Sequence, residues 1–89
     1  MTNNELNKLK RDIEELAFAS SVKSGRPLLQ NIQFQITMLK STVDDAYASN
    51  LLSEISAAIV SVPGNQSNGE NMMAMAMQKL HQLESFTDK

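Results

Sequence analysis

Residues 48–62 have the sequence ASNLLSEISAAIVSV, and this stretch decides the fold. Its apolar side chains recur at steps of three and four residues, at Ala48, Leu51, Leu52, Ile55, Ala58, Ile59 and Val62. That spacing is typical of an α-helix with one apolar face. We therefore predict a helix over about residues 43–61, which needs other helices to cover its apolar face.

Similar apolar stripes predict three more helices, over about residues 4–21, 27–40 and 70–85. In chain order their stripes are Leu6, Leu9, Ile13, Leu16 and Ala17; Leu28, Leu29, Ile32, Ile36, Leu39 and Val43; and Met73, Ala76, Met77, Leu80 and Leu83. The predicted fold is all-α, a small antiparallel four-helix bundle that forms a single domain over residues 1–89. We expect the last few residues to fray.

Several residues predict where the helices begin and end. Thr2 and Glu5 have the spacing of a capping box at the first helix. Gly25 is predicted to end that helix in the left-handed conformation, and Pro27 to occupy the first turn of the second helix. The breaker-rich segment 62–69 is predicted to be a loop, in which Ser67 forms a second capping box with Glu70.

The boundary between the second and third helices is less clear, because neither Pro nor Gly separates residues 27–40 from 43–61. The two apolar stripes differ in direction by well over 90°, so one straight helix could not bury both against the same neighbour. Ser41 with Asp44, and Thr42 with Asp45, also have N-cap spacing. We predict a tight turn or kink near residues 41–45, and a single kinked helix stays open as the alternative.

The composition of the chain argues against some classes of function. The 89 residues carry a formal charge of −2, which argues against a nucleic-acid binder that relies on phosphate neutralisation. Residues 41–78 contain no Lys or Arg, so a solvated surface and an acidic patch for a cationic partner are both open interpretations. The chain lacks Cys, an apolar run of membrane-spanning length and a signal-peptide pattern, so we expect a cytoplasmic protein with no membrane span.

Catalytic chemistry has little support in the sequence. His81 is the only histidine and has no Cys or His partner for a zinc site, so we expect it to pair with Glu84 on a helix surface. Asp44 and Asp45 are explained better as first-turn acids than as a catalytic dyad. We predict that the protein is not an enzyme, with no catalytic, cofactor-binding or metal-binding residue.

The main indication of function in the sequence is a set of apolar residues beyond those that the four helix stripes need to form a core. Met72, Met73, Met75 and Met77 crowd the start of the last helix, where they either fill a core poor in aromatic residues or form an adaptable binding face. The periodicity favours Met73 and Met77 inside, with Met72 and Met75 at the edge.

A second surplus lies on the helix predicted over residues 27–40. Phe34 and Met38 lie opposite its main stripe, among uncharged Gln and Asn residues that are cheaper to desolvate than charged ones. A neutral, merely solvated surface is the alternative there. The predicted protein-interaction residues are Phe34, Met38, Met72 and Met75.

The order of the predicted helices resembles a known family. The chain has a long first helix, a second that starts Pro27-Leu28-Leu29, a third that contains Leu51-Leu52-Ser53-Glu54-Ile55-Ser56, a loop and a last helix. This order resembles small bacteriocin-immunity proteins, which implies an antiparallel four-helix bundle that protects a producer cell by engaging the toxin's membrane receptor complex. The chain departs from that family because it lacks the frequent basic, aromatic-containing C-terminal region.

These observations predict a non-enzymatic interaction or regulatory module. It would bind a protein partner or associate with itself, as a homodimer, through apolar helix faces. One alternative is a bacteriocin-immunity-like function. The second alternative is a small nucleic-acid-associated regulator whose Lys8, Arg11 and Lys23 contact phosphates.

Overall fold

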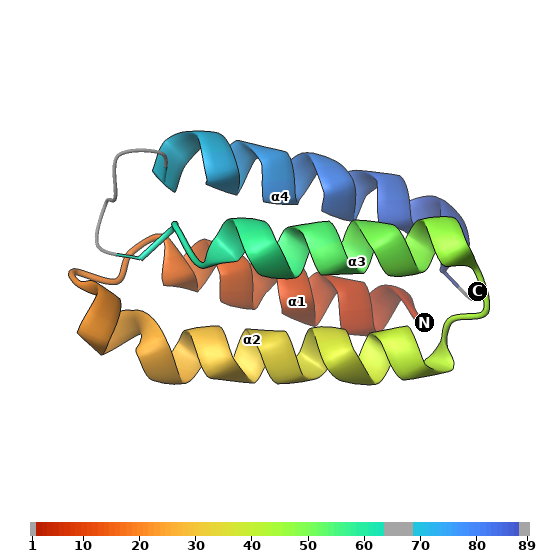
Figure 1. Cartoon of the computed structure of the whole chain (residues 1–89), viewed down its shortest axis with the longest axis horizontal. Coiled ribbons are helices and arrows are strands. Elements are labelled where there is room, and N and C mark those ends of the chain that lie inside the picture. The colour runs from red at the N-terminus through yellow and green to blue at the C-terminus, as the bar shows by residue number, and fades with distance from the viewer. Residues whose placement is uncertain (1, 64–68, 88–89) are drawn as a thin grey trace.

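The computed structural model describes residues 2–63 and 69–87. Four α-helices follow one another as α1 (Asn3–Leu16), α2 (Val22–Thr42), α3 (Ala46–Ile59) and α4 (Gly69–Leu83). A short 3-10 helix, η1 (Glu84–Phe86), continues α4. Successive helices run in opposite directions (Figure 1). The predicted all-α four-helix bundle is confirmed.

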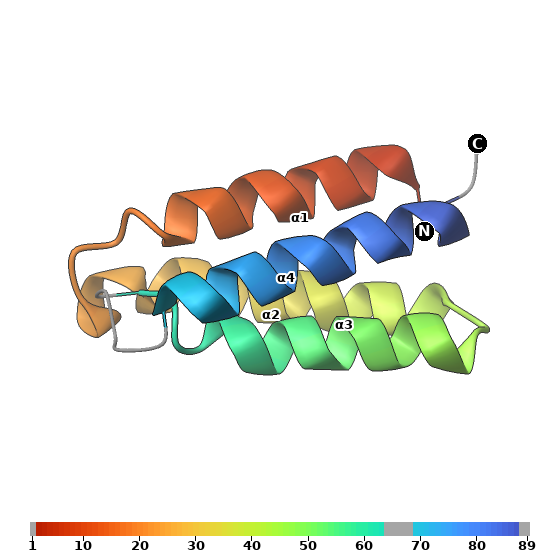
Figure 2. The ribbon, with the colours of Figure 1, turned by 90° about the horizontal axis from the view of Figure 1, so that it is seen from above.

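Each helix packs against the two helices that flank it in the bundle. Contacts join α1 to α2, α2 to α3, α3 to α4 and α4 back to α1, with the most extensive contact between α3 and α4. The same cyclic order is visible in two perpendicular views (Figures 1 and 2). The α1–α2 seam and the α3–α4 seam therefore lie on opposite sides of the bundle.

The core follows the predicted apolar stripes. The seven stripe positions of residues 48–62 are all buried, as are four positions of α1, three of α2 and three of α4. Leu28, Leu29 and Val43 are half-buried and pack at the edge of this core. The helix period read from the sequence thus identifies the buried face of each helix.

The boundary between α1 and α2 differs from the prediction. Helix α1 ends at Leu16 and not near Ser21, and α2 begins at Val22 and not at Pro27. The Ser21 hydroxyl accepts a hydrogen bond from the Ser24 amide at 3.0 Å, and the Ser21 amide donates to the Ser24 hydroxyl at 3.1 Å. This reciprocal cap satisfies free amides at the start of α2.

Gly25 and Pro27 consequently lie inside α2, so neither has the predicted role. Gly25 is buried, and a Cβ atom added there would lie 2.7 Å from Pro63 Cβ and 3.0 Å from Ala19 Cβ. Gly25 therefore permits close packing of α2 against the segment that follows α3. Pro27 is the sixth residue of α2, where its ring removes only one backbone hydrogen bond near the helix start.

Helices α2 and α3 are separate, which confirms the predicted turn near residues 41–45. Val43 is extended, and the Asp45 carboxylate accepts a hydrogen bond from the Ala48 amide at 3.0 Å. The hydroxyls of Ser41 and Thr42 donate instead to carbonyls in the last turn of α2. Only Asp45 of the proposed capping residues therefore caps α3, which begins at Ala46 and ends at Ile59.

The two predicted capping boxes have different outcomes. At α1, Thr2 and Glu5 form both reciprocal hydrogen bonds, at 3.0 and 3.2 Å, as predicted. Ser67 lies outside the described residues. Helix α4 begins at Gly69 and ends at Leu83, with η1 covering the last residues of the predicted 70–85 helix.

Replacing Gly25 tests the close packing at the start of α2. In an open helical position, Gly→Ala raises the free energy of unfolding by about 1 kcal/mol. Because the new methyl group would meet the rigid ring of Pro63, we expect Gly25→Ala to lower it by ~1–3 kcal/mol. Urea unfolding followed by circular dichroism measures the sign. The exposed Gln30→Ala is the control, and a stabilised Gly25→Ala variant would show that the position is open.

The neighbouring aspartates offer a second test. Asp45 accepts the capping hydrogen bond of α3, whereas Asp44 does not cap the helix. Asp45→Ala should lower the free energy of unfolding by ~1 kcal/mol. Asp44→Ala, one residue earlier and also exposed, is the matched control. Equal losses in the two variants would assign the effect to acidic charge near α3 and not to the cap.

Candidate interaction surfaces

Phe34 and Met38 lie on the outward face of α2. The side chains of Ile32, Ile36 and Leu39 point into the core, whereas Phe34 is 65% exposed and Met38 is 53% exposed. Since residues advance by 100° along a helix, Phe34 lies almost opposite the mean direction of Ile32 and Ile36. The fold therefore turns this aromatic ring away from its own core.

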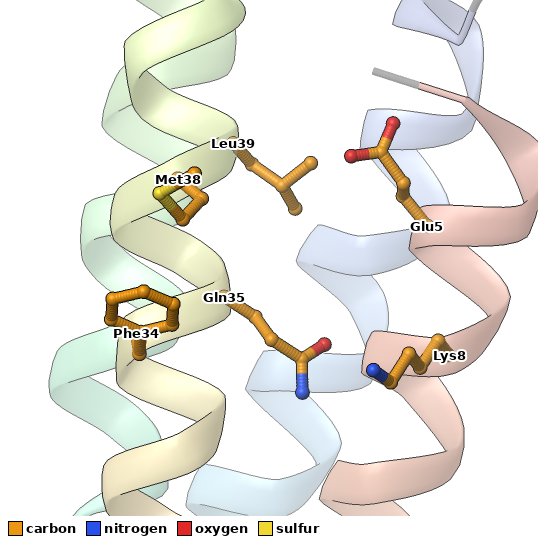
Figure 3. Close-up of a pocket in the computed structure, with 6 residues that line it drawn as sticks. All are labelled: Glu5, Lys8, Phe34, Gln35, Met38 and Leu39. Atoms are coloured by element: carbon orange, nitrogen blue, oxygen red, sulfur yellow. The ribbon is translucent and has the colours of Figure 1, made fainter.

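A shallow depression, here called the α1–α2 groove, lies beside these two side chains (Figure 3). Its volume is about 170 Å³, and its lining consists of Glu5, Lys8, Phe34, Gln35, Met38 and Leu39. The Gln35 amide donates to the Asp12 carboxylate at 2.7 Å and so joins the two helices. The groove is smaller than the ~300–1,000 Å³ of typical small-molecule sites. It suits one or two protruding side chains of a protein.

Met72 and Met75 line a second depression, the α3–α4 groove, together with Glu54, Ala57, Ala58 and Lys79. Its volume is about 290 Å³. The Lys79 ammonium lies 2.6 Å from the Glu54 carboxylate and bridges the two helices. The small side chains of Ala57 and Ala58 leave room for a neighbouring helix to approach.

Met73 and Met77 line a third depression, between α4 and the residues that follow α1 and α3. This groove has a volume of about 390 Å³, and its other lining residues are Ala17, Val62, Gly69, Glu70 and Ala74. All four methionines are half-buried and pack against the core. Met72 and Met75 therefore lie at the edge of the core as predicted, whereas the predicted inner position of Met73 and Met77 is wrong. The four side chains divide between two grooves, because they lie on opposite flanks of the buried Ala76 and Leu80.

The four predicted interaction residues do not form one site. Phe34 and Met38 lie together at the α1–α2 groove, and Met72 and Met75 lie together at the α3–α4 groove. These seams are on opposite sides of the bundle (Figures 1 and 2). Of the two pairs, only Phe34 and Met38 are mainly exposed.

Two further aromatic side chains, outside the predicted interaction residues, are exposed. Phe18, which lies off the apolar stripe of the first helix, is 86% exposed in the link that follows the end of α1 at Leu16. The serine pair Ser20-Ser21 was the available signal for this earlier helix end. Tyr47 is 56% exposed, its ring centroid lies 5.8 Å from that of Phe86, and its hydroxyl donates to the Gln82 side chain at 3.2 Å.

The ionisable side chains of residues 2–63 and 69–87 form surface contacts and no metal-binding cluster. His81 Nδ1 lies 3.4 Å from the Glu84 carboxylate, so the expected neighbour is present on the helix surface. Residues 2–63 and 69–87 contain no group of three or more His, Cys, Asp or Glu side chains arranged to hold a metal ion. Over the same part of the chain, every helix is too short or too polar to cross a bilayer.

The chain has no significant match among protein-family models, curated proteins or solved structures. The resemblance to bacteriocin-immunity proteins therefore rests on the residue pattern and on the four-helix architecture. Many unrelated functions share such an architecture, so it carries no function by itself. The geometry of the surfaces is the basis for a proposal.

Truncating Phe34 tests whether its ring belongs to a surface. We expect Phe34→Ala to change the free energy of unfolding by less than ~0.5 kcal/mol, because the ring is mainly exposed. Ile36→Ala, two residues away and buried, should cost ~2–5 kcal/mol. Denaturant unfolding at low protein concentration measures both values for the monomer. A loss above 2 kcal/mol for Phe34→Ala would mean that the ring stabilises the fold.

Proposed function

We propose that this protein is a non-enzymatic interaction module of the cytoplasm, which binds a protein partner or a second copy of itself through apolar helix faces. The single observation that carries the proposal is the outward position of Phe34, which is 65% exposed on a helix that buries Ile32, Ile36 and Leu39 on its opposite face. An exposed aromatic ring beside an apolar groove is a common anchor of protein interfaces. Met38, one turn along α2, extends the same surface.

The surroundings of Phe34 also favour a protein ligand. Residues 27–39 contain no charged side chain, so covering this part of α2 requires no ion to lose its hydration. The methionine-lined α3–α4 groove on the opposite side of the bundle, together with the groove of Met73 and Met77, offers a second, more adaptable apolar surface. The α2 face is the primary surface in this proposal.

The nucleic-acid alternative gains no specific support from α1. Lys10 and Glu14 are four residues apart, as are Arg11 and Glu15, and Glu5 lies three residues before Lys8. At these spacings the acidic and basic side chains are neighbours on the helix surface. The basic residues of α1 are therefore interleaved with acids, and phosphate groups would meet mixed charge.

Single charge insertions test the proposal and identify the face. We expect Phe34→Glu to weaken self-association or partner binding at least tenfold, since it places a carboxylate at the centre of the apolar surface. Met75→Glu tests in the same way whether the α3–α4 groove is a binding surface. Sedimentation equilibrium over a concentration series measures self-association, and quantitative affinity capture from cells expressing the protein measures partner binding.

Asn50→Glu is the control for the added charge, because Asn50 is an exposed residue of α3 that lines none of the three grooves. Circular dichroism checks that each variant keeps its helix content. A wild-type protein that stays monomeric and binds nothing in a Phe34- or Met75-dependent manner would contradict the proposal.

A further inference from the structure

The exposed face of α2 forms one continuous stripe along the whole helix. Its members recur at steps of three and four residues and are all exposed: Lys23, Pro27, Gln30, Asn31, Phe34, Thr37, Met38 and Ser41. With 21 residues, α2 is the longest helix of the bundle, roughly 30 Å at 1.5 Å per residue. Lys23 is the only charged member of the stripe, and it lies at the helix start.

The spacing within this stripe matches that of paired helices. Pro27, Asn31, Phe34, Met38 and Ser41 are separated alternately by four and three residues. That alternation keeps a seam of side chains facing a second helix, as in a coiled coil. The two large apolar members, Phe34 and Met38, occupy the middle of the seam. The stripe therefore has the pattern expected when another α-helix packs along α2.

The charges at the two ends of α2 are opposite in sign. Lys23 and Arg26 are exposed at its start, whereas Asp44 and Asp45 are exposed just after its end. The last turn of α2 also contains Lys40, whose ammonium donates to the Ser53 hydroxyl of α3 at 2.7 Å and so faces away from the stripe. The first turn of α2 contains no acidic residue. Basic residues at a helix start oppose the helix dipole, so Lys23 and Arg26 do not stabilise α2 itself. Their position is explained if they face negative charge from outside the subunit.

We propose that this protein forms a homodimer in which α2 packs antiparallel against α2 of a second copy, around a two-fold axis near Phe34 and Met38. This inference rests on the proposed function and names its partner. A two-fold interface pairs residue i with residue j and j with i. The axis places Phe34 against the partner subunit's Met38, and Lys23 and Arg26 near the partner subunit's Asp44.

The charges decide the direction of the pairing. In a parallel pair, the basic start of α2 would face the same basic start, and the acidic end would face the acidic end. Both contacts would be repulsive. In the antiparallel pair both ends are attractive, and the two helix dipoles also oppose each other. The charge distribution of α2 is therefore complementary to itself only in the antiparallel arrangement.

The α1–α2 groove fits this arrangement. Gln35 and Leu39 point from α2 toward α1, while Phe34 and Met38 stand on the outer side of α2 (Figure 3). The groove lies next to the seam and can take up a side chain of the opposing α2. Glu5 and Lys8 flank it about one turn apart on α1, and the Glu5 carboxylate also accepts the capping hydrogen bond of the Thr2 amide. The same two-fold rotation brings Glu5 toward the partner subunit's Lys8. The α3–α4 groove differs, because its Glu54 and Lys79 pair with each other.

Charge reversal at the two ends of α2 tests the proposal in the full chain. The first variant is Lys23→Glu/Arg26→Glu, the second is Asp44→Lys, and the third combines all three substitutions. Asp45 is kept because it caps α3. Sedimentation equilibrium at low salt gives the dimer dissociation constant, and thermal unfolding monitors the fold. Phe34→Glu and Asn50→Glu serve as the positive and negative controls.

The antiparallel dimer predicts a specific pattern. Each of the first two variants dimerises about tenfold more weakly than wild type, since two symmetric contacts change from attraction to repulsion. The third variant, and an equimolar mixture of the first two, recover association to near the wild-type value. The first variant should also be at least as stable as wild type as a monomer, because its acids complement the dipole of α2. Weaker association in that variant is then not a sign of unfolding.

Four outcomes would overturn the inference, and the first three separate it from the proposed function. A dimer that Phe34→Glu disrupts but that charge reversal leaves unchanged means a different helix orientation, with the proposed function intact. A dimer that only Met75→Glu disrupts means that the α3–α4 groove is the interface. A wild-type protein that stays monomeric while another protein binds it in a Phe34-dependent manner excludes a second copy as the partner. If no binding depends on Phe34 or Met75, both proposals fail.

Discussion

The shortness of the helices is the constraint on which the structure depends. Helices α1, α3 and α4 have 14 or 15 residues, a length at which an isolated helix is marginal in water. Each becomes stable only when the others cover its apolar stripe. The close approach at Gly25 serves this end, because it brings the start of α2 against Pro63 and closes the core where α3 finishes. Polar bridges then join the neighbouring helices, as between Gln35 and Asp12 or between Lys79 and Glu54.

Much of this fold can be predicted from apolar spacing, and the exceptions have physical reasons. The stripe from Ala48 to Val62 predicts a buried face residue by residue, because burial follows the helix period directly. Gly25 and Pro27 were misread because their usual meaning is local, whereas the close contact of Gly25 with Pro63 joins residues 38 positions apart. The serine cap at Ser21 overrides the local signal. No sequence pattern alone could reveal the contact between Gly25 and Pro63.

The candidate surfaces were less predictable than the core, because only part of their geometry follows from the phase of a single helix. The outward position of Phe34 and Met38 follows from their phase relative to Ile32 and Ile36, and the structure places them accordingly. The division of the methionines between two grooves depends on how α1 and α3 flank α4, which is a property of the assembled bundle. Phe18 also lies off the apolar stripe of the first helix by its phase, whereas its place in the link after α1 depends on a helix end that the stripe does not mark.

The contact of Tyr47 with Phe86 and Gln82 has a practical consequence. Tyr47 is the only tyrosine, and the chain has no tryptophan, so it is the dominant intrinsic fluorophore. Its ring lies at the start of α3, against the 3-10 turn that ends the described chain. We therefore expect its emission to change when that terminal turn detaches, because the ring then loses its contacts with Phe86 and Gln82. Tyr47 is thus a natural fluorophore at one end of the bundle, so no engineered probe is needed there.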